Sequence, residues 1–139
     1  MFMTGKPSLK QLIEAAETEK WDYVDESLPK IGGDEHFIRW AYAHGLEAKD
    51  KNVRDLAGSI LEKATITESA FSPIRSIIAE SVEKERHPYA KYRMAFALAA
   101  HGVGKYSGKV IPILEEASRD KDVGSIAEGY LKQLKKHKY

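Results

Sequence analysis

The sequence has no cysteine among its 139 residues. Without thiols the chain can form neither disulfides nor thiolate metal sites, and nothing in it requires an oxidising compartment. It also has no apolar run near the roughly 18 residues that a membrane span needs, and the opening "MFMTGKPS" lacks the apolar core and cleavage site of an export signal. We therefore expect a cytoplasmic protein with no membrane partner.

Alternation of apolar and polar residues over strand length is absent as well, so the sequence predicts no β-sheet. Apolar residues recur instead at helical intervals. The clearest stripe begins at Leu9, where Ser8 and Gln11 have the form of a capping box. Asp34 and Asp50 are placed to cap later helices. We predict eight helices with short connections, which gives an all-α class with antiparallel neighbours.

Two prolines bear on where the later helices begin and bend. Pro73 lies inside a helical stripe that runs from about Thr67 to Glu85. Either the helix is kinked at Pro73, or the main helix begins with Ser72 as its cap and Pro73 in its first turn, and we favour the second arrangement. Pro112 predicts a bend in the seventh helix.

Three of the expected helices are partial copies of one another. They read "VRDLAGSIL" from Val53, "AKYRMAFAL" from Ala90 and "VGSIAEGYL" from Val123, the last in a helix expected to begin at Asp120. The copies start 37 and then 33 residues apart, an interval typical of helical solenoids, whose units bury their apolar faces by stacking. Close approach between neighbouring units then explains the small residues inside these stripes, such as Ala57 and Gly58. We predict an α-α superhelix of about four antiparallel helix pairs.

The extended copies "DKNVRDLAGSILEKA", "HPYAKYRMAFALAAHG" and "DKDVGSIAEGYLKQL" resemble the first helix of HEAT repeats, especially the short type named after phycobilisome lyases. In that family an Asp or Pro start is followed by an apolar residue and Arg, then by Ala and Leu at helical intervals. The resemblance covers residues 50 to 136. Lys91 and Gly124 replace the family's Arg in the second and third copies.

The resemblance implies one HEAT-like domain over residues 1–139. We expect a divergent N-terminal cap over residues 1–33 and repeats over residues 34–139. Because the family includes scaffolds, lyases, hydroxylases and nucleic-acid-binding proteins, it implies a fold and not one function.

Residue patterns for catalysis are few. There is no Gly-x-Ser-x-Gly elbow, and "GVGKYSG" from Gly102 lacks the strand and the spacing of a phosphate-binding loop, so a helix end followed by a helix start explains it better. His36 and His44 are eight residues apart on one expected helix, too far to share a metal ion. We therefore expect no cofactor, no metal site and no enzymatic activity. The five histidines, better explained by capping or surface positions, are His36, His44, His87, His101 and His137.

Charge is distributed unevenly along the chain. Residues 1–35 hold four lysines and eight acidic residues, a net −4, whereas residues 84–109 hold six lysines or arginines against Glu85 alone, a net +5. Tyrosines lie between these basic residues, as backbone contact and base stacking on a nucleic acid would require. Alternatively, the basic side chains pair with nearby acids and the tyrosines are buried between helices. The candidate binding residues are Lys84, Arg86, Lys91, Arg93, Lys105 and Lys109.

The first functional hypothesis is a non-catalytic protein–protein interaction module or scaffold that presents a solenoid groove to another protein. We expect the second helix of each unit, around residues 75–83 and 109–116, to line this groove. The alternative is a nucleic-acid-binding protein that uses the basic residues of 84–109, related in fold to the longer HEAT-like alkylation-repair glycosylases. A lyase or hydroxylase comes third. A homodimer would cover the exposed end of so short a stack.

Overall fold

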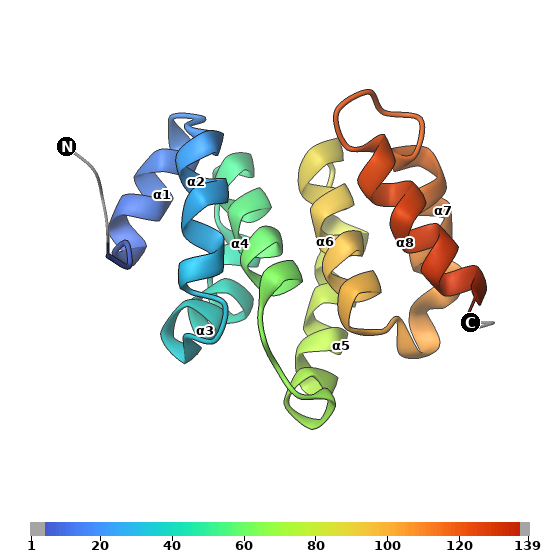
Figure 1. The fold of residues 1–139 in the computed structure, drawn as a ribbon. Helices are drawn as coiled ribbons and strands as arrows, with labels where there is room; N and C mark the ends of the chain where they lie inside the picture. The colour runs from blue at the N-terminus through green and yellow to red at the C-terminus, as the bar shows by residue number, and fades with distance from the viewer. Residues whose placement is uncertain (1–4, 137–139) are drawn as a thin grey trace.

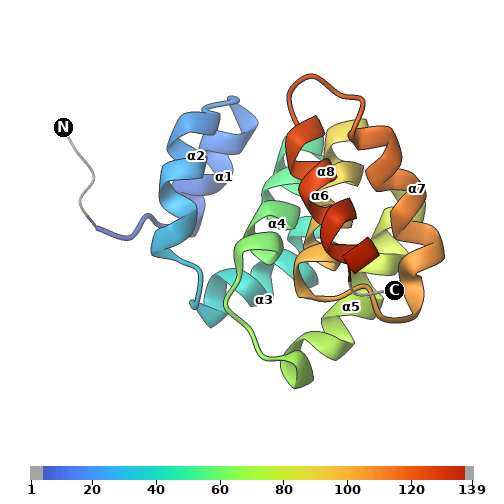
Figure 2. The same ribbon diagram turned by 45° about the vertical axis from the view of Figure 1, so that its right-hand side comes forward.

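The computed structural model describes residues 5–136, which form eight α-helices and three short 3₁₀ segments and contain no strand. The all-α prediction is therefore confirmed. Helices follow one another in space in chain order, from α1 and α2 at one end to α7 and α8 at the other (Figures 1 and 2). The elements are α1 (Leu9–Glu17), α2 (Trp21–Ser27), η1 (Leu28–Lys30), α3 (Glu35–Ala43), η2 (Gly45–Glu47), α4 (Lys51–Lys63), α5 (Glu68–Lys84), α6 (Pro88–His101), η3 (Gly104–Tyr106), α7 (Ser107–Ala117) and α8 (Gly124–Lys136).

Local capping fixes where the early helices begin. The backbone N–H of Gln11 donates to Ser8 Oγ at 3.1 Å and that of Ser8 donates to Gln11 Oε1 at 2.8 Å, which confirms the capping box. Asp34 accepts from the N–H of His36, and Asp50 accepts from the N–H of Asn52 at 2.7 Å. These bonds satisfy N–H groups that the first helical turn leaves free.

The expected start at Ser72 is wrong, because α5 runs unbroken through Pro73. Thr67 caps the helix by accepting a bond from the N–H of Ala70 at 3.2 Å. Phe71 and Ile74 are both buried, so a continuous helix places the two side chains in the core. Pro73 itself is exposed and removes one backbone donor, a loss that this burial outweighs.

The last helix begins later than expected. Asp120 accepts hydrogen bonds from the N–H groups of Asp122 and Val123 at 2.8 and 3.0 Å, so it closes a turn, and α8 starts at Gly124. A Cβ on Gly124 would lie 2.7 Å from the carbonyl oxygen of Ser118, so the turn packs tightly on the end of α7. A side-chain cap and a turn use the same kind of bond, and the sequence did not distinguish them.

Helices pack in consecutive pairs: α1 with α2, α3 with α4, α5 with α6, and α7 with α8. Between pairs, α4 lies along α6 and α6 contacts α8. Helix α6 also contacts α5 and α7, as expected for a helix that is apolar on nearly all sides. The three equivalent positions of the sequence copies, Ala57, Met94 and Ala127, are all fully buried in one core.

Small residues of α4 mark the closest contacts. A Cβ on Gly58 would lie 3.0 Å from Cγ of Arg93 on α6, which confirms that this glycine permits helices of neighbouring pairs to approach. Ala57 is small for a different reason. It faces η2 of its own pair, where a Cβ on Gly45 would lie 2.7 Å from the Cβ of Ala57.

Across the described part of the chain, no helix combines the length and the apolar character that crossing a bilayer requires.

Candidate binding groove

The six basic residues singled out from the sequence do not form one patch. Lys84 and Arg86 come just before Pro88, the first residue of α6, whereas Lys105 comes after the last. Helix α6 has 14 residues, so about 20 Å separates its ends. Lys91 lies between them and is half-buried. The structure therefore spreads these residues along the length of the helix.

Two of the six are already paired with carboxylates. Arg93 Nη1 donates to Glu62 Oε1 at 3.1 Å, and Lys109 pairs with Glu83. Among the described residues the other four form no ion pair, and of these Lys84 and Arg86 are exposed near each other at the edge of a hollow between η2 and the end of α5.

Two of the three tyrosines of this region bind acidic side chains, and the third, Tyr106, donates to Ser76 Oγ at 3.3 Å. Tyr92 is buried and donates to Glu116 Oε2 at 2.6 Å, and Tyr89 donates to Asp120 Oδ1 at 2.9 Å. These hydrogen bonds, with burial, raise the pKa of both phenols to about 12. The Tyr92 ring is buried between helices, as the second interpretation of the tyrosine spacing expects, whereas Tyr89 is half-buried.

Arg54 of α4 is paired one to one. Its Nε and Nη2 donate to the two carboxylate oxygens of Glu85, at 2.7 and 3.0 Å, and its Nη1 donates to the carbonyls of Ala48 and Lys49. The Glu85 side chain is 2% exposed and also accepts from the backbone N–H of His87. This geometry satisfies both charges and ties the start of α6 to the start of α4.

Arg93 of α6 is shared between two carboxylates. Glu62, whose side chain is fully buried, accepts from Arg93 and also from the hydroxyl of Tyr130 at 2.6 Å. Asp55 Oδ1 lies 3.7 Å from Arg93 Nε. Burial raises the pKa of Asp55 to about 6; the Arg93 charge opposes this increase, and the carboxylates of Glu62 and Asp25 add to it. Negative charge is therefore in excess around Arg93.

A hollow of about 490 Å³ opens beside Asp55. Helix α4 lies between α2 and α6 (Figure 1). All three helices contribute lining residues to this hollow, among them Trp21 of α2 and Tyr89 of α6. Both aromatic side chains are half-buried. The lining consists of Glu19, Trp21, Asp25, Lys51, Asn52, Asp55, Ser59, His87, Tyr89, Arg93, Asp122 and Val123.

A second hollow of about 510 Å³ adjoins the first and shares Asp25 and Arg93 with it. Its other lining residues are Leu28, Pro29, Lys63 and Ile126 of α8, and Ile126 is 38% exposed. The two hollows together cross α2, α4, α6 and α8, and we call them the central groove.

The central groove lies on other helices than the sequence indicated. Residues 75–83 and 109–116 belong to α5 and α7, which do not line it. The apolar pattern shows which side chains of a helix pair are buried. It does not show on which side of the stack the pairs leave a hollow.

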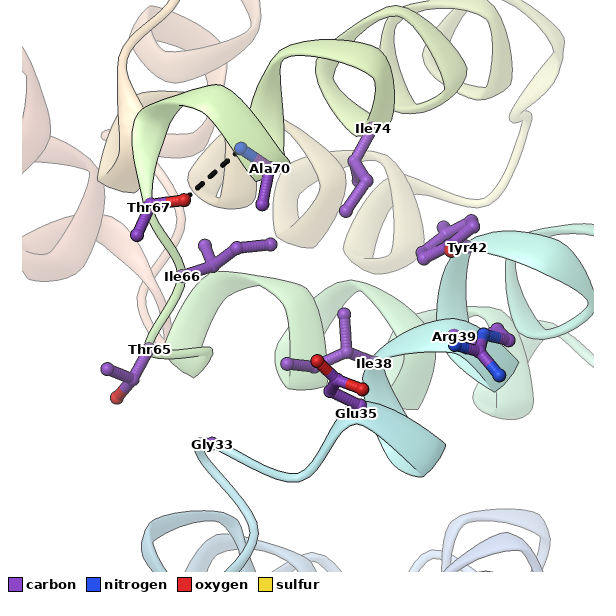
Figure 3. A pocket seen from close by; sticks show the side chains of 10 residues that line it. All are labelled: Gly33, Glu35, Ile38, Arg39, Tyr42, Thr65, Ile66, Thr67, Ala70 and Ile74. Atoms are coloured by element: carbon purple, nitrogen blue, oxygen red, sulfur yellow. Dashed lines mark hydrogen bonds between the residues drawn. The ribbon is translucent and has the colours of Figure 1, made fainter.

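A further hollow, of about 350 Å³, lies between α3 and α5 (Figure 3). Side chains of Ile38, Ile66, Ile74 and Tyr42 point into it, while Arg39 points away. Its interior therefore offers space for an apolar side chain and no cluster of charged groups.

Histidines do not converge on a metal site in the residues that the structure describes, where no group of three or more His, Cys, Asp or Glu side chains could hold an ion. His101 bonds through Nε2 to the carbonyl of Leu61 at 2.8 Å. His87 Nδ1 is buried without a hydrogen-bond partner. His137 lies outside the described residues.

Sequence reasoning missed Asp55 and Glu62. Their signal was present, since two acidic residues seven positions apart share one face of a helix, here a helix whose other faces are mostly apolar. Acidic residues at this interval inside an apolar stripe indicate a buried charge network.

In comparisons with known proteins, this chain matches no protein-family model, no curated protein and no solved structure.

Proposed function

We propose that this chain is a non-catalytic binding module, a HEAT-like solenoid of helix pairs that holds a segment of another protein in the central groove. Three features support the solenoid: the chain-order arrangement of the pairs, the equivalent burial of Ala57, Met94 and Ala127, and the close contact of α4 with α6 at Gly58.

The observation that carries the proposal is that two adjoining hollows share Asp25 and Arg93, and that Tyr89 and Arg93 in their lining are held by contacts inside the molecule. Tyr89 is held by hydrogen bonds to Asp120 and Asp122, and Arg93 is held by Glu62. Binding to fixed side chains costs little ordering of the receptor. Half-buried Trp21 adds a large aromatic surface of the kind that dominates binding energy at protein interfaces.

Co-purification with a matched pair of variants tests this function. Tagged wild-type protein should retain one partner at near-equal amounts, and Trp21→Ala in the groove should lose it. Tyr42→Ala, which removes a half-buried aromatic side chain from the hollow between α3 and α5, should keep it. Circular dichroism must first show that both variants are folded.

Loss of the partner with Tyr42→Ala and retention with Trp21→Ala would contradict the proposal. Nucleic acid as the partner would show as salt-sensitive retention on heparin that is lost in Lys84→Glu with Arg86→Glu. These two residues are exposed and outside the buried Arg93 network, so this double variant probes the surface without disturbing the core.

A further inference from the structure

Building on the function proposed above, we propose that the segment bound in the central groove is basic. Its lysine or arginine side chains lie against Asp25, Asp55 and Asp122, and its apolar side chains cover Trp21 and Ile126. A lysine- or arginine-rich extended peptide is thus the class of partner that the groove fits.

The charges of the groove are not balanced. Its lining includes four carboxylates, from Glu19, Asp25, Asp55 and Asp122, and three cations, from Lys51, Lys63 and Arg93. The guanidinium of Arg93 is already bound by a fifth carboxylate, that of buried Glu62. In the described part of the chain, Glu19 and Asp25 form no ion pair. A partner whose charge complements that of the groove is therefore positively charged.

Asp55 differs from Glu19 and Asp25 in being largely buried while its contacts are long. Its Oδ1 lies 3.7 Å from Arg93 Nε and 3.4 Å from Ser59 Oγ, both longer than a good hydrogen bond, although its side chain is only 14% exposed. A carboxylate held largely out of water without close partners is costly. An ammonium or guanidinium group entering the groove would supply the missing donors.

Aromatic walls favour the same partner. Trp21 and Tyr89 line the hollow. The stems of lysine and arginine pack on aromatic side chains of this kind, and a cation over an aromatic ring gains further stabilisation. The same carboxylates repel an acidic peptide or a phosphate backbone. Ile126, Leu28 and Pro29 at the other end of the groove provide apolar contact for the rest of a peptide.

Selection of random dodecapeptides displayed on phage against the full chain tests the inference, followed by fluorescence anisotropy with the synthesised winners. We expect enrichment of Lys or Arg together with aromatic or aliphatic residues. Replacing the basic residues of a winner by Gln should weaken binding by about tenfold. On the protein, Asp25→Lys should weaken binding by a similar factor, on the order of tenfold.

Asp22→Lys is the matched control, since Asp22 is exposed on the same helix but does not line the groove. It should change the affinity by less than about twofold, because its charge is screened by solvent. Both positions are exposed, so both variants are expected to fold. Asp55→Asn gives a second, independent reading and should weaken binding in the same direction as Asp25→Lys.

The outcomes separate this inference from the proposed function. Winners that lose binding to Trp21→Ala but contain no excess of basic residues would overturn the inference and leave the groove as a docking site. Equal effects of Asp22→Lys and Asp25→Lys would also overturn it, because binding would then follow net charge alone. Winners that bind Trp21→Ala as well as wild type, or a selection without winners, would count against the groove itself.

Discussion

Two arginines connect α4 and the region of α6 in opposite directions, and they are paired in different ways. Arg54 reaches from α4 to Glu85 just before α6, and one carboxylate satisfies it in two-point contact. Arg93 reaches from α6 back to α4, where Glu62 and Asp55 share it. The first pair is a closed structural link. The network around Arg93 has more negative than positive charge and borders the central groove. We infer that this excess of negative charge serves binding and not stability.

Removing Arg93 should have the largest effect. In Arg93→Met the buried carboxylate of Glu62 loses its closest cation, with Lys63 Nζ at 3.9 Å the remaining one. We expect the free energy of unfolding, from urea titrations followed by circular dichroism, to fall by about 4 kcal/mol. Adding Glu62→Met should recover part of the loss, because no buried charge then lacks a partner. A loss below about 1 kcal/mol in the single variant would contradict the buried-network account.

Asp55 should make the chain less stable at neutral pH than an uncharged side chain would. Its pKa in the folded chain is about 6, above the ordinary 3.8, so between these values the folded state binds a proton that the unfolded state has released. The stability that this group contributes is therefore fully present below pH 3.8 and declines by up to about 3 kcal/mol as the pH rises through 6.

Asp55→Asn tests this expectation. The variant should be more stable than wild type at pH 7 by up to about 3 kcal/mol, with the difference shrinking towards pH 4. Arg93, Ser59, Glu62 and Asp25 act on Asp55, and His87 lines the same hollow. Urea titrations of both proteins across this range separate Asp55 from the other titrating groups. Equal pH profiles would show that Asp55 is charged without penalty.

Breaking the other pair should cost less. We expect Arg54→Met to lower the free energy of unfolding by about 3 kcal/mol, because one buried carboxylate, Glu85, loses its cation, whereas two carboxylates lose theirs when Arg93 is removed. The affinity of groove-binding peptides should not change, because Arg54 lies outside the central groove. A stability loss equal to that of Arg93→Met, or a change in peptide affinity, would remove the distinction between the two arginines.

The smallest change in stability is expected for a substitution at Gly58, which tests the close contact between Gly58 and Arg93. An added methyl in Gly58→Ala would lie 3.0 to 3.3 Å from Arg93, including its backbone carbon, and we expect a net loss of about 1 kcal/mol despite the better helix propensity of alanine. Gly129→Ala on α8, with open space around the new methyl, should instead gain up to about 1 kcal/mol. Thermal unfolding of both variants gives the comparison, and effects of the same sign would argue against close packing at Gly58.

Much of the fold was predictable because its signals are local. Helix starts at Ser8, Asp34 and Asp50 follow from side-chain caps, and the recurrence of small and apolar residues identified the helices that pack together. The errors had two causes. The burial of Phe71 and Ile74 favours a helix that continues through Pro73. At Asp120 the side chain accepts bonds that are alike in a turn and in a helix cap, so the start of α8 was placed too early.

The candidate site was less predictable, since charge was counted along the chain and not in space. Arg93 was assigned to a basic cluster, but its partners are residues on α4, 31 and 38 positions earlier. Spacing on a single helix could have shown Asp55 and Glu62 on one face. Only the three-dimensional structure shows that Trp21 and Asp25 of α2 line the same hollow as Asp55 of α4.

The hydrogen bond from Tyr130 to Glu62 also affects how the molecule opens. It joins the last helix to α4 across 68 positions, whereas units of a simple linear array touch only their neighbours and can fray from the ends. If α8 detached, the buried carboxylate of Glu62 would lose the hydrogen bond from Tyr130. Amides of α8 should therefore exchange with solvent at rates tied to those of α4, so that the C-terminal pair opens together with the centre of the molecule.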